Sequence, residues 1–394
     1  MILVIGGRSK IGATLIGELL DRDQQVRALV RPGEPAGGLP AGAEAVAGDL
    51  ADEGSLVTAM TGIEKVFLLS SPHPAAIGWH RNAIDAARRT QVQLLVRSSI
   101  LGADRESPAE FIGAHTACDR YLEDSGLPYV IVRPNLFLQN IPESTIPSID
   151  ASGTFYADAG QARISMVDTR DVAAVAAVAL TESGHAGAHY DVTGPEALSY
   201  ADVAAALTSA MGRRISYADA PDDAVRQALL GAGLSEWFAG ALVGLYQDYR
   251  RSGTDGYAAQ VTSTVRRLTG RPPRSLDDLL GEIAAALGGA AAAIAETAAG
   301  GSRRAAGLYQ ISAACLRLIE DVDTSSPRCR APRNLARRKP DSLTRASTAP
   351  ARGNSWPRRT SLPLFHQRAG HLIRDPVSHR FRRGSPPCWL GSPR

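Results

Sequence analysis

Short apolar runs alternate with segments of helical periodicity through the first third of the chain. The apolar runs predict strands at 2–5, 26–30, 43–47, 65–69, 92–96 and 129–132. The segments between them predict helices at 11–20, 55–60, 76–89 and 109–124. Regular alternation of this kind is typical of a parallel sheet with helices on both faces, whose strands are apolar on both sides. The pattern therefore predicts a doubly wound α/β fold.

The pattern becomes less regular after residue 134. Residues 135–168 contain Pro142, Pro147 and Gly153 and predict a long irregular excursion. Further helices are expected at 171–180, 200–211, 222–232, 236–250 and 275–287, with short strands at 189–192 and 215–217. We interpret residues 1–288 as one domain, with a core of about 1–134 plus 165–195 and a small α+β substrate lobe formed by the remainder.

Composition and charge change beyond residue 289. Residues 290–299 are of low complexity, and residues 302–394 are rich in Arg, Pro and Ser without sustained periodicity. Residues 291–394 carry 19 Lys and Arg against 6 Asp and Glu, whereas residues 1–290 carry 24 against 34. The sequence thus predicts a disordered basic tail at 289–394. An artefact of a shifted reading frame or a missed stop is the equal alternative.

Targeting and metal-binding features are missing from the sequence. The chain starts directly with an apolar strand, without a basic n-region, and no run of about 18 apolar residues follows. Only Cys118 of the four cysteines lies before residue 290, where we expect it to be a buried apolar residue. His73 and His80 have no further ligands at metal-site spacing. A reduced, cytoplasmic protein without a membrane span or metal is expected, and its oligomeric state cannot be predicted.

A glycine-rich turn follows the first strand and opens the first helix. Its sequence is Gly6-Gly7-Arg8-Ser9-Lys10-Ile11-Gly12. Gly6 permits a tight turn, Gly12 lets the helix pack closely on the strand, and the helix N-terminus offers N–H groups to a pyrophosphate. Ser9 stands where the usual pattern has its middle glycine, but it is small and its hydroxyl can donate to phosphate. The turn predicts a Rossmann-type dinucleotide site, against the alternative of a βα turn without a ligand.

The end of the second strand indicates which dinucleotide is bound. NAD sites usually carry Asp or Glu there to hold the ribose 2′-hydroxyl, whereas NADP sites carry Arg. Here Val30 is followed by Arg31 and no acid is present, while Arg8 can join Arg31 from the first loop. The sequence therefore predicts NADP(H), with NAD(H) possible. The alternative is that Arg31 is only a solvated loop cation.

With these residues in hand, the chain resembles the NmrA-like group of atypical short-chain dehydrogenases, and within it the NAD(P)H:quinone reductase-like members. The similarity extends from Met1 to about Gly288. The matching segments are 26–32, 48–50 with 55–56, 66–69, 98–99, His115 with Asp119, 125–129, 133–134 with Phe137 and Asn140, 167–168 with 171–173, and 193–195. Their order and spacing together make the resemblance specific, since no single segment would suffice.

The resemblance implies positions for the cofactor. Carried onto this sequence, they are Asp49 and Leu50 at the adenine, Leu69, Ser70 and Ser71 along the path to the nicotinamide ribose, and Ser98 and Ser99 beside the nicotinamide. The group usually has Glu where this chain has Asp119, which leaves the role of that acid open. The Ser9 departure affects the pyrophosphate grip and not the fold.

The usual catalytic pair of short-chain dehydrogenases is absent. They use a Tyr with a Lys four residues later, but the only lysines here are Lys10, Lys65 and Lys339. His115 and Asp119 share one face of the corresponding helix, and Ser99 is a further candidate. An oriented His can donate a proton near neutral pH. The alternative is a structural hydrogen bond between His115 and Asp119.

Quinone reduction requires orientation more than a strong acid, because water can supply the proton. The sequence therefore predicts an NAD(P)H-dependent oxidoreductase that acts on a quinone or a similar small electrophile. A non-enzymatic NADP(H) sensor is the second hypothesis. A third is binding of nucleic acid or another acidic partner through the basic tail, although the acidic body argues against nucleic acid.

Truncation after Gly289 tests the predicted tail. Cofactor affinity and melting temperature should stay essentially unchanged, because the tail has no apolar pattern with which to dock. Calorimetry and cofactor titration of both forms measure this. A drop of several degrees, which for a body of this size is roughly 1 kcal/mol or more, would mean that the tail packs on the body.

Overall fold

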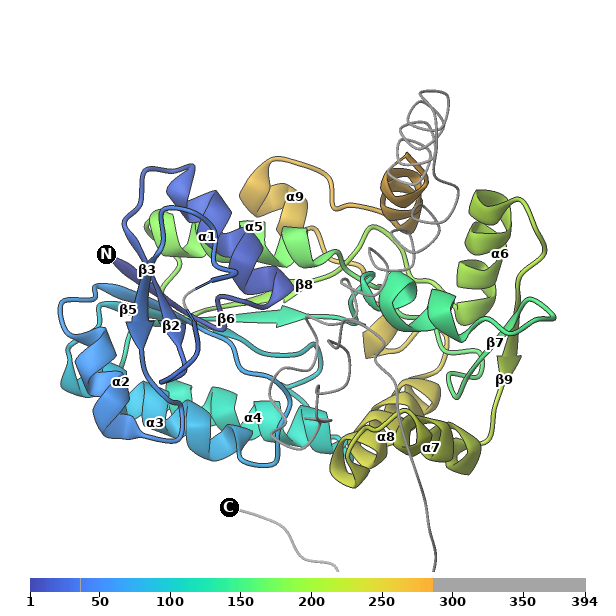
Figure 1. Cartoon of the computed structure of the whole chain (residues 1–394), viewed down its shortest axis with the longest axis horizontal. Helices are drawn as coiled ribbons and strands as arrows, with labels where there is room; N and C mark the ends of the chain where they lie inside the picture. Colours follow the sequence, from blue (N-terminus) through green and yellow to red (C-terminus); the bar gives the residue numbers. More distant parts are fainter. Residues whose placement is uncertain (36, 286–394) are drawn as a thin grey trace, which may run out of the picture. The chain divides into compact units, whose positions relative to one another are not determined.

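The computed structural model describes residues 1–35 and 37–285 (Figure 1). The predicted tail at 289–394 lies outside these residues, and so does the end of the helix predicted at 275–287. Within the described ranges, no helix has the length and apolar character needed to cross a membrane.

Seven parallel strands form the main sheet. They are β1 (Ile2–Ile5), β2 (Val26–Val30), β3 (Glu44–Ala47), β4 (Lys65–Leu68), β5 (Leu94–Ser98), β6 (Tyr129–Pro134) and β8 (Ala188–Val192). Their order is β3-β2-β1-β4-β5-β6-β8, so the chain reverses its direction of winding between β1 and β4. This topology confirms the predicted doubly wound fold.

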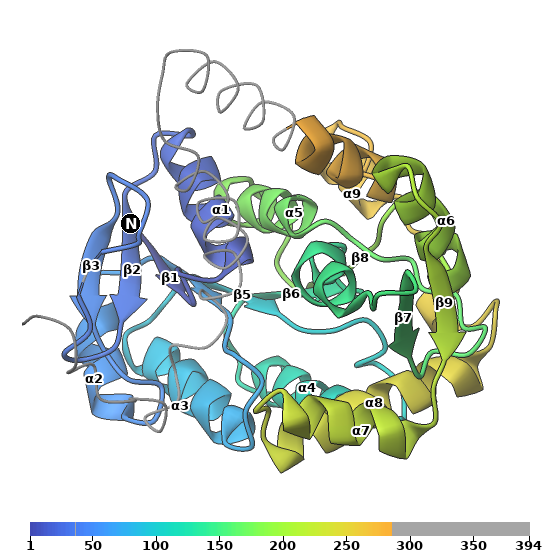
Figure 2. The same cartoon turned by 45° about the vertical axis from the view of Figure 1, so that its right-hand side comes forward.

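Helices cover both faces of this sheet (Figures 1 and 2). One face carries α1 (Lys10–Leu20), α5 (Thr169–Thr181) and α9 (Thr264–Thr269), and the other carries α2 (Glu53–Met60), α3 (Ala76–Arg89) and α4 (Glu110–Glu123). Leu15 and Val175 belong to the core on the first face, and Ile84 and Leu122 belong to the core on the second. Burial on both faces explains why the strands are apolar runs instead of alternating ones.

A smaller lobe lies beside the sheet (Figure 2). It contains a parallel strand pair, β7 (Thr154–Ala157) with β9 (Ser216–Asp219), and the helices α6 (Tyr200–Met211), α7 (Asp222–Gly231) and α8 (Glu236–Ser252). Short helical turns occur at η1 (Ile141–Thr145), η2 (Ile146–Ser148) and η3 (Tyr257–Ala259), and residues 276–285 are helical. The sequence pattern missed β7 and α9. β7 lies within residues 135–168, which were interpreted as an irregular excursion, and α9 has only six residues, fewer than two helical turns.

The strand predicted at 92–96 is displaced by two residues. The observed strand, β5, includes Arg97 and Ser98, whose polarity marked the end of the apolar run. Both side chains are nevertheless buried, with Arg97 only 1% exposed. A buried guanidinium requires partners, and these partners form part of the site described below.

The turn between β1 and α1 depends on close approach of the backbone. Gly6 adopts a φ of +84°, which favours glycine. A Cβ atom at Gly12 would lie 2.1 Å from the carbonyl oxygen of Gly6, far inside van der Waals contact. A side chain at Gly12 would therefore push α1 away from β1.

Replacing Gly12 with Ala should destabilise the fold, whereas Gly17→Ala on the same helix should not. A Cβ atom at Gly17 would meet nothing within 4 Å. We expect Gly12→Ala to cost about 1–3 kcal/mol or more through overpacking, and Gly17→Ala to stabilise by about 0.5–1 kcal/mol. Denaturant unfolding of the two variants checks this. Equal stability would mean that β1 and α1 do not require the close contact.

Candidate active site

The predicted cofactor residues lie at the carboxyl ends of neighbouring strands. In sheet order from β3 to β5, the strand ends lead into Asp49 and Leu50, Arg31, the turn at 6–12, Leu69 and Ser70, and Ser98 and Ser99. Open α/β sheets bind ligands at this edge, where the winding direction reverses. The fold therefore arranges residues that are far apart in the sequence along one edge.

The glycine-rich turn has the donors that a pyrophosphate needs. Ser9 is the N-cap of α1: its Oγ accepts from the Gly12 N–H at 3.0 Å and donates to the Gly6 carbonyl oxygen at 2.8 Å. The N–H groups of Lys10 and Ile11 have no acceptor among the described residues. Unpaired N–H groups at a helix N-terminus favour an anion, so the residues present fit a dinucleotide phosphate.

Acidic side chains pair with the cations of this edge. Lys10 Nζ lies 2.7 Å from Glu143 in η1. Glu34 lies 2.5 Å from Arg8 Nη1 and 3.7 Å from Arg31 Nη1. Glu34 was not predicted from the sequence. The prediction used only the residues at the end of β2, and the position of a residue further along the loop cannot be derived from the strand.

Hydrogen bonds between backbone and side chains fix the turn between β3 and α2, where the adenine was predicted. The Asp49 N–H donates to Ser55 Oγ at 2.9 Å, and Asp49 Oδ1 accepts from the Ala51 N–H at 2.9 Å. The Leu50 carbonyl accepts from Asn82 Nδ2 at 2.9 Å. Both residues are partly buried, so their positions are set by the fold.

At the carboxyl end of β5, the buried side chain of Arg97 is the centre of a polar cluster. Its Nε donates to His80 Nδ1 at 2.9 Å, its Nη2 donates to His115 Nδ1 at 3.0 Å, and its Nη1 pairs with Asp119. A guanidinium has no acceptor atom, so both imidazoles must accept at Nδ1. Their protons are therefore on Nε2.

This tautomer determines the direction of the next hydrogen bonds. His80 Nε2 lies 2.9 Å from Ser70 Oγ and must donate to it, which leaves the Ser70 proton available to another acceptor. Ser99 Oγ donates to Asp119 Oδ2 at 2.8 Å, so its remaining capacity is as an acceptor. Ser70 and Ser99 thus present opposite polarities.

Asp119 holds the cluster together. It is 1% exposed, and its Oδ2 also accepts from Arg133 Nε at 3.3 Å. Burial raises the pKa of its carboxyl, while Arg97, Ser99 and Arg133 offset that effect by favouring the carboxylate. The hydrogen bond considered between His115 and Asp119 is replaced by a shared partner, because Arg97 binds both.

The two histidines of the cluster are neutral. Burial and the positive charge of Arg97 lower the pKa of His115 to about 3, and burial with the same charge lowers the pKa of His80 well below its usual value. This corrects the expectation of a protonated His115 near neutral pH. Neutral His115 still carries a proton on Nε2, which has no partner within the described ranges.

Arg97 and His80 are two further site residues that were not predicted from the sequence. The available signal was the charged residue directly after the apolar run of β5. Cys118, on the same helix as His115, is buried, and burial raises the pKa of its thiol. It is therefore unsuited to act as a thiolate near neutral pH.

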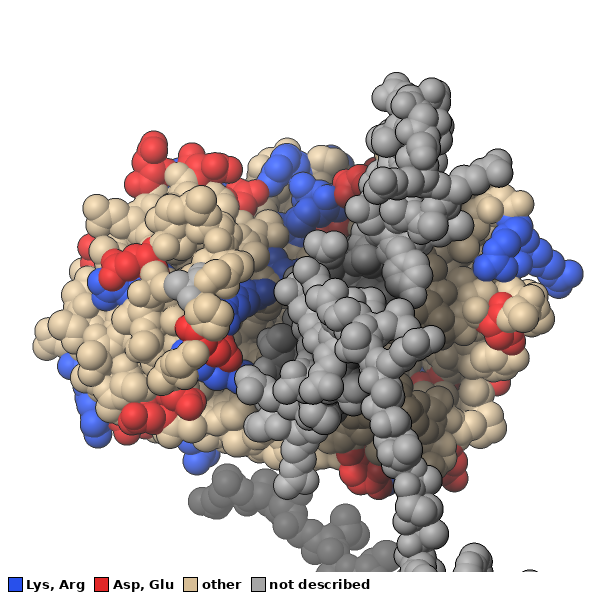
Figure 3. All heavy atoms as spheres, in the orientation of Figure 1, with Lys and Arg blue, Asp and Glu red and all other residues tan. Residues whose placement is uncertain are grey.

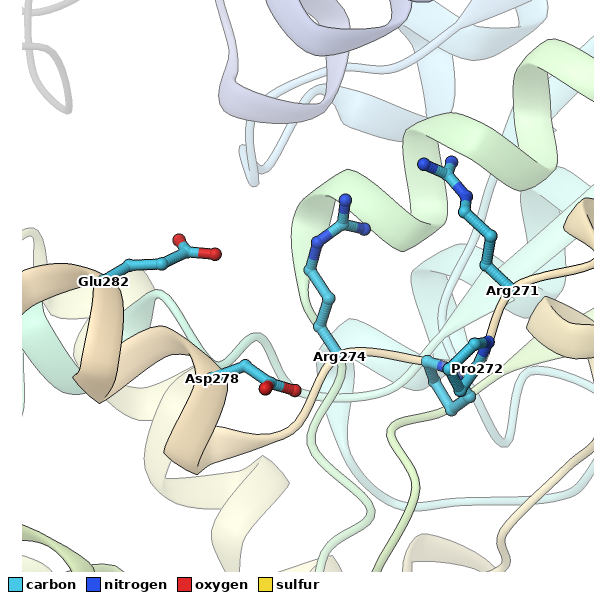
Figure 4. Close-up of a pocket in the computed structure, with 6 residues that line it drawn as sticks. Arg271, Pro272, Arg274, Asp278 and Glu282 are labelled. Atoms are coloured by element: carbon cyan, nitrogen blue, oxygen red, sulfur yellow. The ribbon is translucent and has the colours of Figure 1, made fainter.

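A separate hollow of about 370 Å³ lies beside α5 (Figure 4). Arg271 and Arg274 point toward α5 in this view, and Asp278 and Glu282 follow on the next helix. Arg274 pairs with Asp171, and Glu282 lies 2.7 Å from Arg170. These pairs attach residues 271–282 to α5. Charges of both signs occur on the face shown in Figure 3.

Taken together, the sheet order, the glycine-rich turn and the unpaired N–H groups define a dinucleotide-binding Rossmann protein. A family model described as NAD(P)H-binding matches residues 6–183. The chain is 36% identical to the NAD(P)H azoreductase of Xenophilus azovorans over 289 residues, which cover 73% of this chain and 99% of that protein. The chain belongs to this NAD(P)H-binding family of atypical short-chain dehydrogenases and is an NAD(P)H-dependent oxidoreductase.

Two further comparisons agree with this assignment. A (4-alkanoyl-5-oxo-2,5-dihydrofuran-3-yl)methyl phosphate reductase of Streptomyces griseus is 35% identical over 287 residues, which cover 73% of this chain and 99% of that protein. The structure of the NADPH-dependent quinone oxidoreductase 2 of Escherichia coli with NADPH has a TM-score of 0.66 at 28% identity, covering 72% of this chain and 99% of that chain. These relatives favour an enzyme over the sensor considered from the sequence.

The neutral histidines predict a loss of stability in mild acid. The pKa of His115 falls from 6.5 to about 3 on folding, so the unfolded chain binds the extra proton between these values. Stability is thus complete above pH 6.5 and decreases as the pH falls below it, by about 1 kcal/mol per such histidine between pH 7.5 and 5.5. Denaturant unfolding at both pH values measures the change.

His115→Gln should reduce the loss of unfolding free energy between pH 7.5 and 5.5 by the about 1 kcal/mol that His115 contributes. This holds whatever the substitution does to stability at pH 7.5. His73→Gln, in an exposed loop, is the control for removal of an imidazole and should retain the wild-type loss. A His115→Gln protein with the full wild-type loss would contradict a neutral, half-buried His115 held by Arg97.

Proposed function

We propose that this oxidoreductase reduces a quinone, or a similarly electron-poor conjugated acceptor, without a Tyr–Lys pair. The observation that supports this most directly is the neutral imidazole of His115, held by Arg97 at the carboxyl edge of the sheet. The relatives are named for azo, furanone and quinone chemistry, and each of these acceptors contains a conjugated double bond.

The edge residues divide the binding of NAD(P)H among them. In this proposal the N–H groups of Lys10 and Ile11 bind the pyrophosphate, in a turn that Gly6, Ser9 and Gly12 shape. Arg8 and Arg31 bind a 2′-phosphate, Asp49 and Leu50 the adenine, and Leu69, Ser70 and Ser98 the nicotinamide half. When bound, NAD(P)H supplies the hydride. Ser70 offers a donor and Ser99 an acceptor, so the pair can orient a group that has both, such as a carboxamide.

His115 acts on the acceptor as a neutral hydrogen-bond donor. Its Nε2–H can polarise an acceptor oxygen, because a neutral imidazole is a sufficient electrophile in a partly buried site. It keeps its proton during this contact, since Nδ1 is already occupied by Arg97. Asp119 is a positioning residue in this scheme: it holds Arg97 and Ser99, and it need not contact the acceptor.

A neutral donor favours some acceptors over others. A reduced quinone is a phenolate-type anion whose conjugate acid has a pKa near ~10, so it can leave the site before it is protonated. A simple ketone gives an alkoxide, which requires a proton as it forms. Quinones and related conjugated acceptors therefore suit this site better than simple ketones do.

A turnover panel tests the proposal. NADPH oxidation should be fast with a benzoquinone, measurable with an azo dye or a conjugated furanone, and slower by on the order of 10²-fold or more with an unactivated ketone. Between pH 5.5 and 8 the quinone rate should show no titration of His115, because its pKa lies near 3. Stopped-flow absorbance of NADPH follows each reaction.

His115→Ala should lower quinone turnover by about tenfold or less, because it removes a hydrogen bond and not an acid. His189→Ala is the matched control, since His189 lies near the amino end of β8 and pairs with Glu123 at 2.8 Å. Faster turnover of simple ketones than of quinones would refute the proposal. So would a quinone rate that falls through a pKa near 6–7 and loses this dependence in His115→Ala.

A further inference from the structure

Two arginines assigned to the 2′-phosphate share one carboxylate. Arg8 comes from the turn after β1, Arg31 from the end of β2, and Glu34 lies between them. Arg8 additionally donates to the Pro35 carbonyl, which ties the β1–α1 turn to the loop after β2. An anion therefore already bridges the guanidiniums that would bind the extra phosphate of NADPH.

We infer that Glu34 sets the preference of this enzyme between NADPH and NADH. A carboxylate and a phosphate compete for the same guanidinium donors, and they repel each other when they are close. A carboxylate can also accept a hydrogen bond from a ribose 2′-hydroxyl, which is the usual means of holding NAD. Glu34 thus weakens the binding of NADPH, because it competes with the 2′-phosphate and repels it. It strengthens the binding of NADH, because it can accept a hydrogen bond from the ribose 2′-hydroxyl.

The exposure of the three side chains makes this competition possible. The side chains of Arg8, Arg31 and Glu34 are 35%, 51% and 33% exposed. Exposed ion pairs of this kind contribute little to stability, so one anion can be exchanged for another. The loop after β2 also includes Gly33, with a φ of +82° and no atom of the described residues within 4 Å of its Cβ position. The enzyme therefore accepts both cofactors, with Arg31 supporting one and Glu34 the other.

Binding measurements test the inference. Glu34→Gln removes the charge and keeps the size of the side chain, so the affinity for NADPH should rise about tenfold while the affinity for NADH stays the same or falls. Arg31→Ala should lower the affinity for NADPH and leave the affinity for NADH unchanged. Isothermal titration with both cofactors, and with adenosine 2′,5′-bisphosphate against adenosine 5′-monophosphate, measures these changes without any turnover.

Glu44→Gln is the matched control. Glu44 pairs with Arg27 at 3.1 Å, but this pair lies at the amino ends of β2 and β3, away from the cofactor edge. Its cofactor affinities should match those of the wild type. An equal gain in Glu44→Gln, or an unchanged NADPH to NADH ratio in Glu34→Gln, would overturn the inference.

The inference rests on the proposed cofactor site and is independent of the acceptor. If Arg31→Ala weakens NADPH and Glu34→Gln has no effect, the site is correct and Glu34 does not discriminate. If neither variant changes the affinity for either cofactor, the cofactor site itself is wrong. Failure of quinone turnover would leave the titrations unaffected.

Discussion

The buried charge of Arg97 constrains the whole polar cluster at the carboxyl end of β5. A guanidinium that is 1% exposed must be paired, since removing one partner of a buried ion pair typically costs about 3–5 kcal/mol. Asp119 supplies the countercharge, but the remaining N–H groups also need acceptors, and the two imidazoles provide them. Their tautomers and neutral state follow from this requirement. The polarity of Ser70 follows from the tautomer of His80, and that of Ser99 follows from the Asp119 carboxylate that pairs with Arg97.

The backbone of the phosphate turn is constrained in a different way. Here the requirement is steric: β1 and α1 approach so closely at Gly12 that no Cβ fits. Ser9 replaces a glycine without disturbing this approach, because its hydroxyl is used inside the turn as the helix cap. The N–H groups of Lys10 and Ile11, which have no acceptor among the described residues, are thereby left for an anion. Serine in place of glycine at position 9 therefore adds a side-chain cap to α1 and leaves the backbone N–H donors of the turn in place.

Sequence reasoning succeeded where a physical period was long enough to be read. The alternation of apolar runs and helices gave the parallel sheet, and chemistry at strand ends gave residues that lie along one edge. It missed β7, whose four residues lie between Gly153 and Asp158, because a short strand in an irregular region has no measurable period. Sequence reasoning also missed two residues that form ion pairs with predicted site residues. Arg97 and Glu34 acquire their meaning only from side chains distant in sequence, at positions 119 and 8, and no local pattern encodes those contacts.

The two halves of the proposed site therefore differ in how readily evolution can change them. At the adenine end, selectivity depends on exposed ion pairs that exchange partners at little cost in stability. In the Arg97 cluster, Arg97, Asp119 and His80 are buried and His115 is half-buried, so loss of one member leaves buried polar groups unsatisfied. A substitution near Glu34 can change cofactor preference and leave the chemistry intact, whereas a substitution in the Arg97 cluster alters stability and chemistry together. Relatives that share this fold can thus differ in cofactor through single loop residues, while a new reaction requires coordinated replacement of the buried cluster.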